Sequence, residues 1–315
     1  MTIRDRLQRL RDRIKRDGLQ SVPLWALRWL YWNGGLHQLR PHFKQKALFP
    51  LRNRVLFNRP INVSIGAVPI LLAPKGAEAT AIWSGSRFER HEVAFILGVI
   101  QPDTTFLDIG ANAGIFAIAV AKKVPSAKVY AFEPCAWTFG VLQENIRLNQ
   151  LSNVRAYRTG LGNYKGEATL HINAPGSDGL NTIGQPNHPD SRVVGREKVP
   201  ITTLDAFLVE QNVSQVDVMK VDTEGAELLI FQGGRGLLTR ENAPLILYEG
   251  YSWNTKGFGY HPVEIMWLLQ DYGYSLFVLD SQTGKIAPRQ PAHGYDAMVV
   301  AAKSRHLLQI GMAVV

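Results

Sequence analysis

From residue 104 onward, short apolar segments alternate with longer segments in which apolar residues recur at helical spacing. The pattern predicts strands at residues 104–109, 128–132, 154–158, 216–221, 245–248, 274–279 and 297–302. It predicts helices at residues 114–124, 137–149, 204–211, 226–239 and 262–272. Such alternation is typical of a mainly parallel sheet covered by helices on both faces. The last two strands lack a helix between them and are expected to be antiparallel, so we predict an α/β fold with a seven-stranded, doubly wound, Rossmann-like sheet.

Several segments fall outside this alternation. Residues 63–65 and 68–72 are expected to form a strand pair, and residues 88–100 a helix. Residues 167–172 are expected to extend the third strand as a hairpin. Residues 173–199, rich in Gly, Pro, Asn and Asp, and residues 251–260, rich in Gly and aromatic residues, are expected to be loops. Long loops in compact domains are often functional, so both are candidate walls of a substrate site.

These patterns divide the chain into three zones. Residues 1–60 are a basic, Trp-containing arm, residues 61–103 are lead-in strands and a helix, and residues 104–303 are the α/β domain. With 46% hydrophobic and 19% charged residues, the chain has enough apolar side chains for a sizeable core.

The arm carries the charge of the whole chain. Residues 1–60 contain 14 Lys and Arg against 3 Asp and Glu, whereas the remainder contains 21 against 23. One helical face of the arm is apolar, and tryptophans follow it at helical spacing: Ile3, Leu7, Leu10 and Ile14, then Trp25, Trp29 and Trp32. The arm is interpreted as a packing or pairing element. The alternatives are peripheral contact of residues 1–32 with a membrane, for which a cationic helix with Trp is typical, and nucleic acid binding, which the near-neutral body disfavours.

Two further features bear on location. Cys135 is the sole cysteine, which excludes an internal disulfide and favours a reducing compartment. No apolar run reaches the roughly 18–20 residues that span a bilayer. We expect a cytoplasmic protein, with contact at the inner membrane face as the alternative.

The first core strand ends in a glycine-rich turn that opens a helix. Gly110 permits a sharp turn, and Ala111 and Gly114 leave room for a ligand against the backbone. The N–H groups of the helix start can bind a carboxylate or phosphate. Ligands in such sheets bind at these strand ends. Asp108, Gly110, Ala111, Asn112 and Gly114 are therefore predicted to bind a cofactor.

The second strand ends in Glu133 and Pro134. An acidic residue there can accept hydrogen bonds from both ribose hydroxyls. A dinucleotide fingerprint needs a second glycine where this chain has Asn112. The charge of Asp108 fits a cofactor with a cationic amine and sulfonium, which indicates S-adenosylmethionine (SAM). Gly160 and Leu161 follow the third strand, where the adenine edge would lie, although a plain turn explains them nearly as well.

Further motifs follow in order: Thr203-Leu-Asp205, then residues 219–227 (Met-Lys-Val-Asp-Thr-Glu-Gly-Ala-Glu), then Pro244 and Glu249. With the glycine turn and Glu133-Pro134, the series resembles the FkbM family of SAM-dependent methyltransferases over roughly residues 88–275. The resemblance implies a class I SAM methyltransferase fold and O-methylation of sugars or natural products. The arm lies outside it.

Candidate catalytic residues lie at the ends of the fourth and fifth strands. Asp222 ends one and Glu249 the other, and either is predicted to take the proton of an acceptor hydroxyl. Glu224 in the turn and His261 at a helix start are further candidates, and capping is the alternative role for His261. Asp222 also borders the cofactor site. Asp222, Glu224 and Glu249 also offer oxygen ligands for Mg²⁺, but nothing in their spacing requires a metal and none is assigned.

The predicted function is thus methyl transfer from SAM to a hydroxyl of a sugar, glycan, glycolipid or natural product. A nicotinamide-dependent oxidoreductase is the rival enzyme, because Glu133 would suit its ribose as well. A SAM-binding module without catalysis is the rival of another class. The partner is predicted to be a small-molecule or glycan acceptor rather than nucleic acid.

Overall fold

The computed structural model describes residues 53, 58–84, 89–292 and 296–313. The chain divides into two compact units, residues 1–61 with 72–88 and residues 62–71 with 89–315. In the first, the described part contains helix α5 (Gly76–Trp83). The predicted helix and tryptophans of the arm lie outside the described residues. The division of the chain at residues 60 and 103 stays a prediction.

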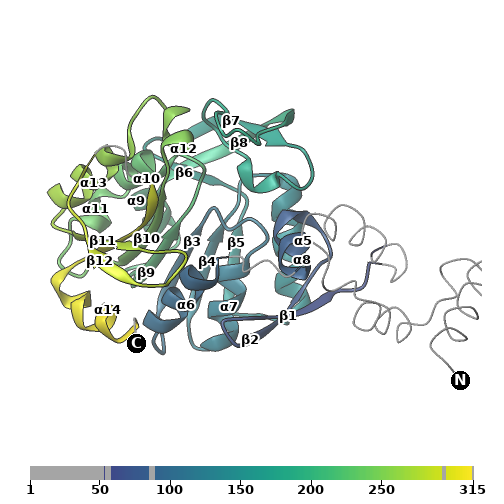
Figure 1. The fold of residues 1–315 in the computed structure, drawn as a ribbon, viewed down its shortest axis with the longest axis horizontal. Coiled ribbons are helices and arrows are strands. Elements are labelled where there is room, and N and C mark those ends of the chain that lie inside the picture. Colours follow the sequence, from purple (N-terminus) through teal and green to yellow (C-terminus); the bar gives the residue numbers. More distant parts are fainter. Residues whose placement is uncertain (1–52, 54–57, 85–88, 293–295, 314–315) are drawn as a thin grey trace, which may run out of the picture. The chain divides into compact units, whose positions relative to one another are not determined.

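A mainly parallel sheet forms the centre of the second unit (Figure 1). Its order is β12-β11-β13-β10-β9-β3-β4-β5. The bounds are β3 (Thr105–Ile109), β4 (Lys128–Phe132), β5 (Val154–Tyr157), β9 (Val218–Val221), β10 (Leu245–Gly250), β11 (Ser275–Leu279), β12 (Ile286–Pro288) and β13 (Ala297–Ala302). All seven predicted strands are present, and β13 is antiparallel to both β10 and β11. The predicted strand count was wrong by one, because the turn-rich link contributes β12 as an edge strand antiparallel to β11.

Helices cover both faces of this sheet. Side chains of α9 (Leu204–Glu210), α10 (Glu227–Gly233) and α13 (Pro262–Asp271) share a core with inward residues of the central strands, among them Ile109, Val221 and Tyr248. Helices α6 (Arg90–Val99) and α7 (Ile115–Lys123) pack on each other, and α7 packs on β3 and β4. Helix α7 is buried at every position from Ile115 to Ala121, and this agrees with its sequence, in which apolar residues occupy every face of the helix over that range.

Alternation along the strands decides which side chains reach the α6–α7 face. Ile109 and Val221 belong to the opposite core, so Asp108 and Lys220, each one residue earlier, point toward α7. The two are register partners on the neighbouring parallel strands β3 and β9. Charged side chains are thereby placed on the buried face of a central sheet.

A second sheet replaces part of the predicted loop region. Strands β6 (Gly160–Gly162), β8 (Val193–Thr203) and β7 (Gly166–Asn173) pair in that order. The expectation that residues 167–172 extend the third strand was therefore wrong, because they pair with β8 instead. The loop predicted at residues 173–199 is likewise shorter: it contains a 3₁₀ turn at Asp178–Leu180 and ends where β8 begins.

Other elements complete the chain. Strands β1 (Ile61–Ile65) and β2 (Val68–Leu72) form the expected pair, and α8 (Ala136–Leu148) follows β4. The helix predicted at residues 226–239 is divided at Gly234 into α10 and α11 (Arg235–Leu238). Residues 251–260 are not wholly a loop, since they contain α12 (Ser252–Lys256). A 3₁₀ turn (Ser304–His306) and α14 (Leu307–Ala313) end the described chain. None of the described helices is long and apolar enough to cross a membrane.

Candidate functional site

The turn after β3 is fixed by close contact with the end of β9. Gly110 has φ of 78°, and a Cβ built there would lie 1.7 Å from the backbone oxygen of Asp222. The amides of Gly110 and Ala111 both donate to the backbone oxygen of Phe132. Glycine is therefore required at residue 110 by conformation and by protein packing, and the turn holds the ends of three strands together.

Gly114 has a packing role as well. It has φ of 87°, and a Cβ there would lie 2.4 Å from Cδ1 of Leu142. The space predicted for a ligand at this residue is filled by α8, so Gly114 lets α7 and α8 approach closely. Asn112, between the two glycines, adopts a left-handed conformation with φ of 47°.

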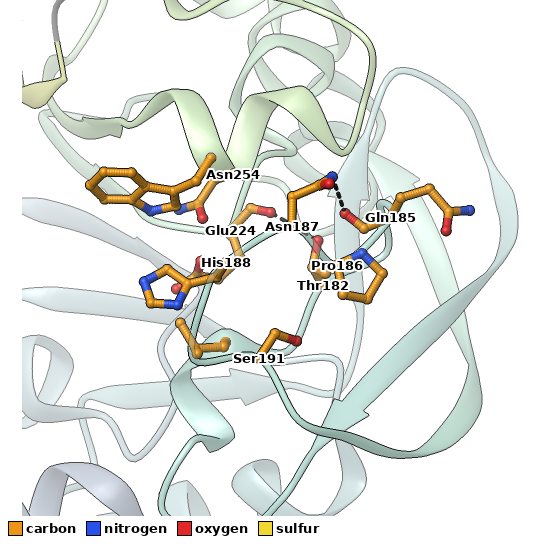
Figure 2. Close-up of a pocket in the computed structure, with 10 residues that line it drawn as sticks. Thr182, Gln185, Pro186, Asn187, His188, Ser191, Glu224 and Asn254 are labelled. Atoms are coloured by element: carbon orange, nitrogen blue, oxygen red, sulfur yellow. Dashed lines mark hydrogen bonds between the residues drawn. The ribbon is translucent and has the colours of Figure 1, made fainter.

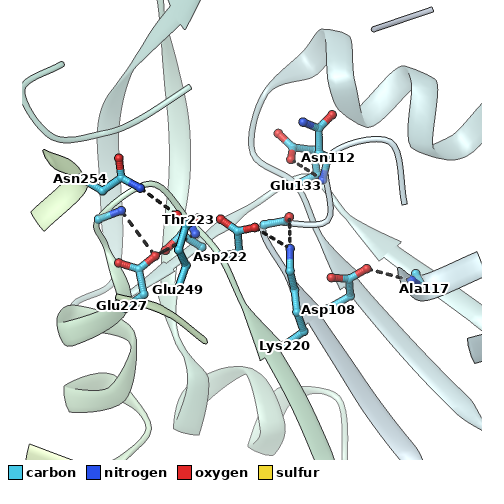
Figure 3. Close-up of polar contacts among 12 residues, drawn as sticks. Asp108, Asn112, Ala117, Glu133, Lys220, Asp222, Thr223, Glu227, Glu249 and Asn254 are labelled. Carbon is cyan, nitrogen blue, oxygen red and sulfur yellow. Dashed lines mark hydrogen bonds and ion pairs between the residues drawn. The ribbon is translucent and has the colours of Figure 1, made fainter. Parts of the chain in front are cut away.

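A buried ion pair lies beneath the turn. Lys220 Nζ is 3.1 Å from Asp222 Oδ2, and their side chains are 5% and 20% exposed. Asp108 is fully buried; its Oδ2 accepts from the amide of Ala117 in α7, while its Oδ1 has no hydrogen-bond partner. Figure 3 shows Lys220 between Asp222 and Asp108.

The pKa values of this group follow from burial and charge. Burial raises the pKa of Asp108, although Lys220 and the Ala117 amide oppose it. Burial alone lowers the pKa of Lys220, but the carboxylates of Asp222, Asp108 and Glu89 outweigh burial, so the pKa lies above its usual value. Lys220 is thus a permanent cation at the site.

Glu133 lies at the end of β4 beside the same turn. Its Oε2 accepts from the amide of Asn112, and its Oε1 accepts from the amide of Cys135 and the hydroxyl of Thr138. Burial raises its pKa, while these donors lower it. The donors fix the orientation of the carboxylate, and Oε2, which has a single donor, keeps acceptor capacity for a ligand.

Residues predicted at the adenine edge have different surroundings. Gly160 begins β6, and a Cβ there would lie 2.7 Å from Ile201 Cδ1 and 3.9 Å from Pro134. The Leu161 side chain is 3% exposed and belongs to the core beneath α9 and α10. Only the backbone of Leu161 is therefore available to a ligand.

Three carboxyl groups converge at the ends of β9 and β10. These groups, here called the rim carboxyls, belong to Asp222, Glu224 and Glu249, and each offers an oxygen within 4.8 Å of the others. Burial, and then neighbouring carboxylates, raise the pKa values of Glu224 and Glu249 well above their usual range. The structure thus brings together three of the four predicted catalytic residues, and Asn254 Nδ2 donates to Glu249 at 2.8 Å (Figure 3).

Buried Glu227 shapes the turn that carries Glu224. Its Oε1 accepts from the amide and the hydroxyl of Thr223, both at 2.8 Å. Tyr260 donates to the Gly225 oxygen, and Thr182 donates to the Glu224 oxygen. Both segments that were predicted as substrate walls therefore hold the turn. They fix Glu224 in a left-handed backbone conformation, with φ of 57°.

A shallow hollow beside Glu224 opens to solvent, and its empty space, part of it open solvent, is about 220 Å³. Figure 2 shows Thr182, His188, Ser191 and Asn254 around it. Trp253 also lines it, and its ring stacks on Tyr251 with centroids 4.6 Å apart. The hollow thus combines hydroxyl, amide and carboxylate groups with an aromatic ring, and both predicted walls contribute to it.

His261, the fourth predicted catalytic residue, caps a helix. Its Nδ1 accepts from the amide of Val263, while Glu264 accepts from the His261 amide, which makes a capping box at the start of α13. This arrangement accounts for His261 as a cap, the alternative role considered from the sequence.

Glu89 was missed from the sequence. It immediately precedes α6, is partly buried, and has φ of 40°. Burial raises its pKa to about 8, and the charges that act on it include Lys220, Asp222 and Asp108. Its place at the start of the helix predicted at residues 88–100 was the sole available signal, and its left-handed backbone cannot be read from periodicity.

Comparison with known proteins agrees with this geometry. Residues 108–276 match the model of the methyltransferase FkbM domain, which is more than half of the chain. The chain belongs to the FkbM methyltransferase family. SAM is the cofactor of this family, and the match spans the glycine turn, Glu133 and the three rim carboxyls, whereas Glu89 lies before it.

Curated relatives share the same region. Methyltransferase 1 of Beauveria bassiana is 32% identical over 148 residues, covering 42% of this chain and 59% of that protein. The 2-O-methyltransferase NoeI of Sinorhizobium fredii is 29% identical, with 48% and 68% covered. The hexuronic acid methyltransferase AglP of Haloferax volcanii is 26% identical, with 51% and 62% covered. The match thus spans about three fifths of the first and third of these proteins.

Proposed function

We propose that the protein transfers a methyl group from SAM to a hydroxyl of a sugar, glycan, glycolipid or related natural product. The observation that carries the proposal is the convergence of Asp222, Glu224 and Glu249, within 4.8 Å, beside a hollow and next to the glycine turn. Family membership supports the methyl transfer. The relatives NoeI and AglP, a 2-O-methyltransferase and a hexuronic acid methyltransferase, support a sugar acceptor.

The residues at the turn fit SAM. Asp108 keeps an unpartnered buried oxygen, and the acids around Lys220 outnumber it, which favours a cationic ligand. Glu133 would hold the ribose hydroxyls, beside Asn112 and Pro134. The backbone of Gly160 and Leu161 would border the adenine. When bound, SAM supplies a methyl group already activated on sulfonium sulfur.

The rim carboxyls would deprotonate the acceptor. A sugar hydroxyl is a weak nucleophile, and a positioned base contributes about 10²–10⁴-fold to such a step. Raised pKa values make Glu224 and Glu249 stronger bases than ordinary carboxylates once they are ionised. Asn254 donates to Glu249, and Lys220 pairs with Asp222 at 3.1 Å, so both carboxyls are held in place and either can accept the proton.

The hollow would hold the acceptor. Trp253 offers an aromatic surface for the apolar face of a sugar ring, while Thr182, Ser191 and Asn254 offer hydrogen bonds. The ligand sites of proteins combine apolar surface with a few placed polar groups in this way. Holding acceptor and methyl in line can supply about 7–11 kcal/mol of the barrier in model systems.

Paired substitutions test the proposal. Purified full-length protein is incubated with methyl-labelled SAM and a panel of neutral and acidic oligosaccharides and glycolipids. Transfer of label by wild type is expected, and transfer by Asp222→Asn/Glu249→Gln should fall by far more than any loss of its affinity for S-adenosylhomocysteine (SAH). Glu241→Gln, an exposed carboxyl that precedes β10 whereas Glu249 lies at the end of that strand, serves as the control. Near-wild-type transfer by the double variant refutes the base assignment, and SAH binding without any transfer favours the non-catalytic module.

A further inference from the structure

A buried cluster on the α6–α7 face has more carboxyl groups than cations. The charges of Asp222, Asp108 and Glu89 all act on the ammonium of Lys220. The pKa of Glu89 is affected by the charges of Lys220, Asp222, Glu92 and Asp108. The charge of Glu89 in turn raises the pKa of Glu249. Among these described groups Lys220 is the one cation.

Lys220 does not satisfy the whole cluster. It pairs with Asp222 at 3.1 Å and approaches the Gly110 oxygen at 3.5 Å. Asp108 Oδ1 stays without a hydrogen-bond partner although the residue is 0% exposed. Buried carboxyl groups without a compensating charge are costly, so the cluster is arranged for one more cation, which none of the residues that the structure describes provides there.

The chain path brings Glu89 to the cofactor turn. Helix α6 leads through residues 100–104 directly into β3 and packs against α7, so α6 runs back along the sheet. The start of α6 therefore lies at the end of β3 that carries Asp108 and the glycine turn. Glu89 is the residue at that start, held in a left-handed conformation.

We propose that Glu89 binds the ammonium group of the amino-acid part of SAM, with the negative charge of Asp108 supporting it from beneath the turn. The inference rests on the proposed cofactor site and adds to it a residue outside the family match at 108–276. SAM brings two cations, the ammonium and the sulfonium. SAM also carries a carboxylate, so it adds a net positive charge to a cluster in which Asp108, Asp222 and Glu89 outnumber Lys220.

The test compares ligands that differ only in the amino-acid part. Binding of SAH and of 5′-methylthioadenosine, which lacks that part, is measured by calorimetry on full-length wild type and Glu89→Gln. The variant is expected to lose about 10- to 100-fold in affinity for SAH, as for the loss of one hydrogen bond to a charged group. Its affinity for methylthioadenosine should be unchanged, which also shows that the site is folded.

Controls separate this inference from the proposed function. Glu241→Gln, an exposed carboxyl in the link that precedes β10, should bind both ligands as wild type does. A deamino analogue of SAH should bind wild type and Glu89→Gln equally. Equal losses for SAH and methylthioadenosine, or no loss for either, overturn the role of Glu89 while leaving the cofactor assignment intact. A wild-type protein that binds neither ligand overturns the cofactor assignment and this inference with it.

Discussion

Replacing Gly110 with alanine is expected to destabilise the protein and to disturb the cofactor turn together. Two penalties act at this residue. A left-handed backbone costs an alanine about 1–2 kcal/mol. The new Cβ would also lie 1.7 Å from the Asp222 oxygen, whereas real Cβ contacts essentially never fall below 3.0 Å. Because the atom it meets is backbone, β3 and β9 must separate, and such overpacking costs about 1–3 kcal/mol more.

Alanine substitutions at two other glycines separate the conformational cost from the cost of the steric contact. Gly176 has φ of 91° and nothing within 4 Å of its Cβ position, so Gly176→Ala should lose only the conformational part, about 1–2 kcal/mol. Gly140 lies exposed in α8 with no such contact and no left-handed φ, so Gly140→Ala should gain about 0.5–1 kcal/mol. Gly110→Ala should lose about 2–5 kcal/mol.

Urea unfolding of the three variants measures these differences, and SAH calorimetry follows any that fold. Gly110→Ala is expected to bind SAH much more weakly, while the other two bind as wild type does. If Gly110→Ala lost no more stability than Gly176→Ala, the contact between the turn and Asp222 would not constrain the fold, and the reasoning would be wrong.

Four further predictions concern charge and substrate. Lys220→Met should destabilise the protein by about 3–5 kcal/mol in urea unfolding, because it leaves buried carboxylates without their cation; a loss below about 1 kcal/mol would contradict the ion-pair account. Glu89 has a pKa of about 8 and is mostly protonated at pH 7, and a bound ammonium would lower that pKa, so calorimetry in buffers of different ionisation enthalpy should show proton release on SAH binding in wild type but not in Glu89→Gln. Trp253→Ala should raise KM for the acceptor at least tenfold with SAH affinity unchanged, and an effect on SAH alone would place the acceptor elsewhere. Transfer should persist in excess chelator, since the proposed base needs no metal, and its loss would instead favour the Mg²⁺ alternative at the rim.

The sequence allowed much of the sheet to be predicted, because strands buried on both faces are continuous apolar runs and the intervening helices have clear periodicity. It also placed Asp222 and Glu249 at neighbouring strand ends, since both follow such runs directly. The second sheet was not predicted. Strand β8 is exposed or partly exposed at most positions and pairs with β6 and β7, and local periodicity does not encode such pairing.

The details of the site depended on contacts between distant residues. The contact of Gly110 with Asp222 joins segments 112 positions apart, and it adds packing to the sharp turn as a reason for the glycine. The hydrogen bonds of Thr182 and Tyr260 to the rim turn arise from segments without regular patterns. Glu89 was overlooked because its role depends on charges contributed by β3 and β9, not on its own neighbours in sequence.

The most direct test of the central claim is calorimetric titration of the purified full-length protein with SAH and with NAD, on wild type and Glu133→Ala. The account predicts saturable binding of SAH at one site per chain, no binding of NAD, and SAH binding that is strongly weakened in Glu133→Ala. Binding of NAD in place of SAH, or SAH binding that is indifferent to Glu133, would contradict the assignment of this site.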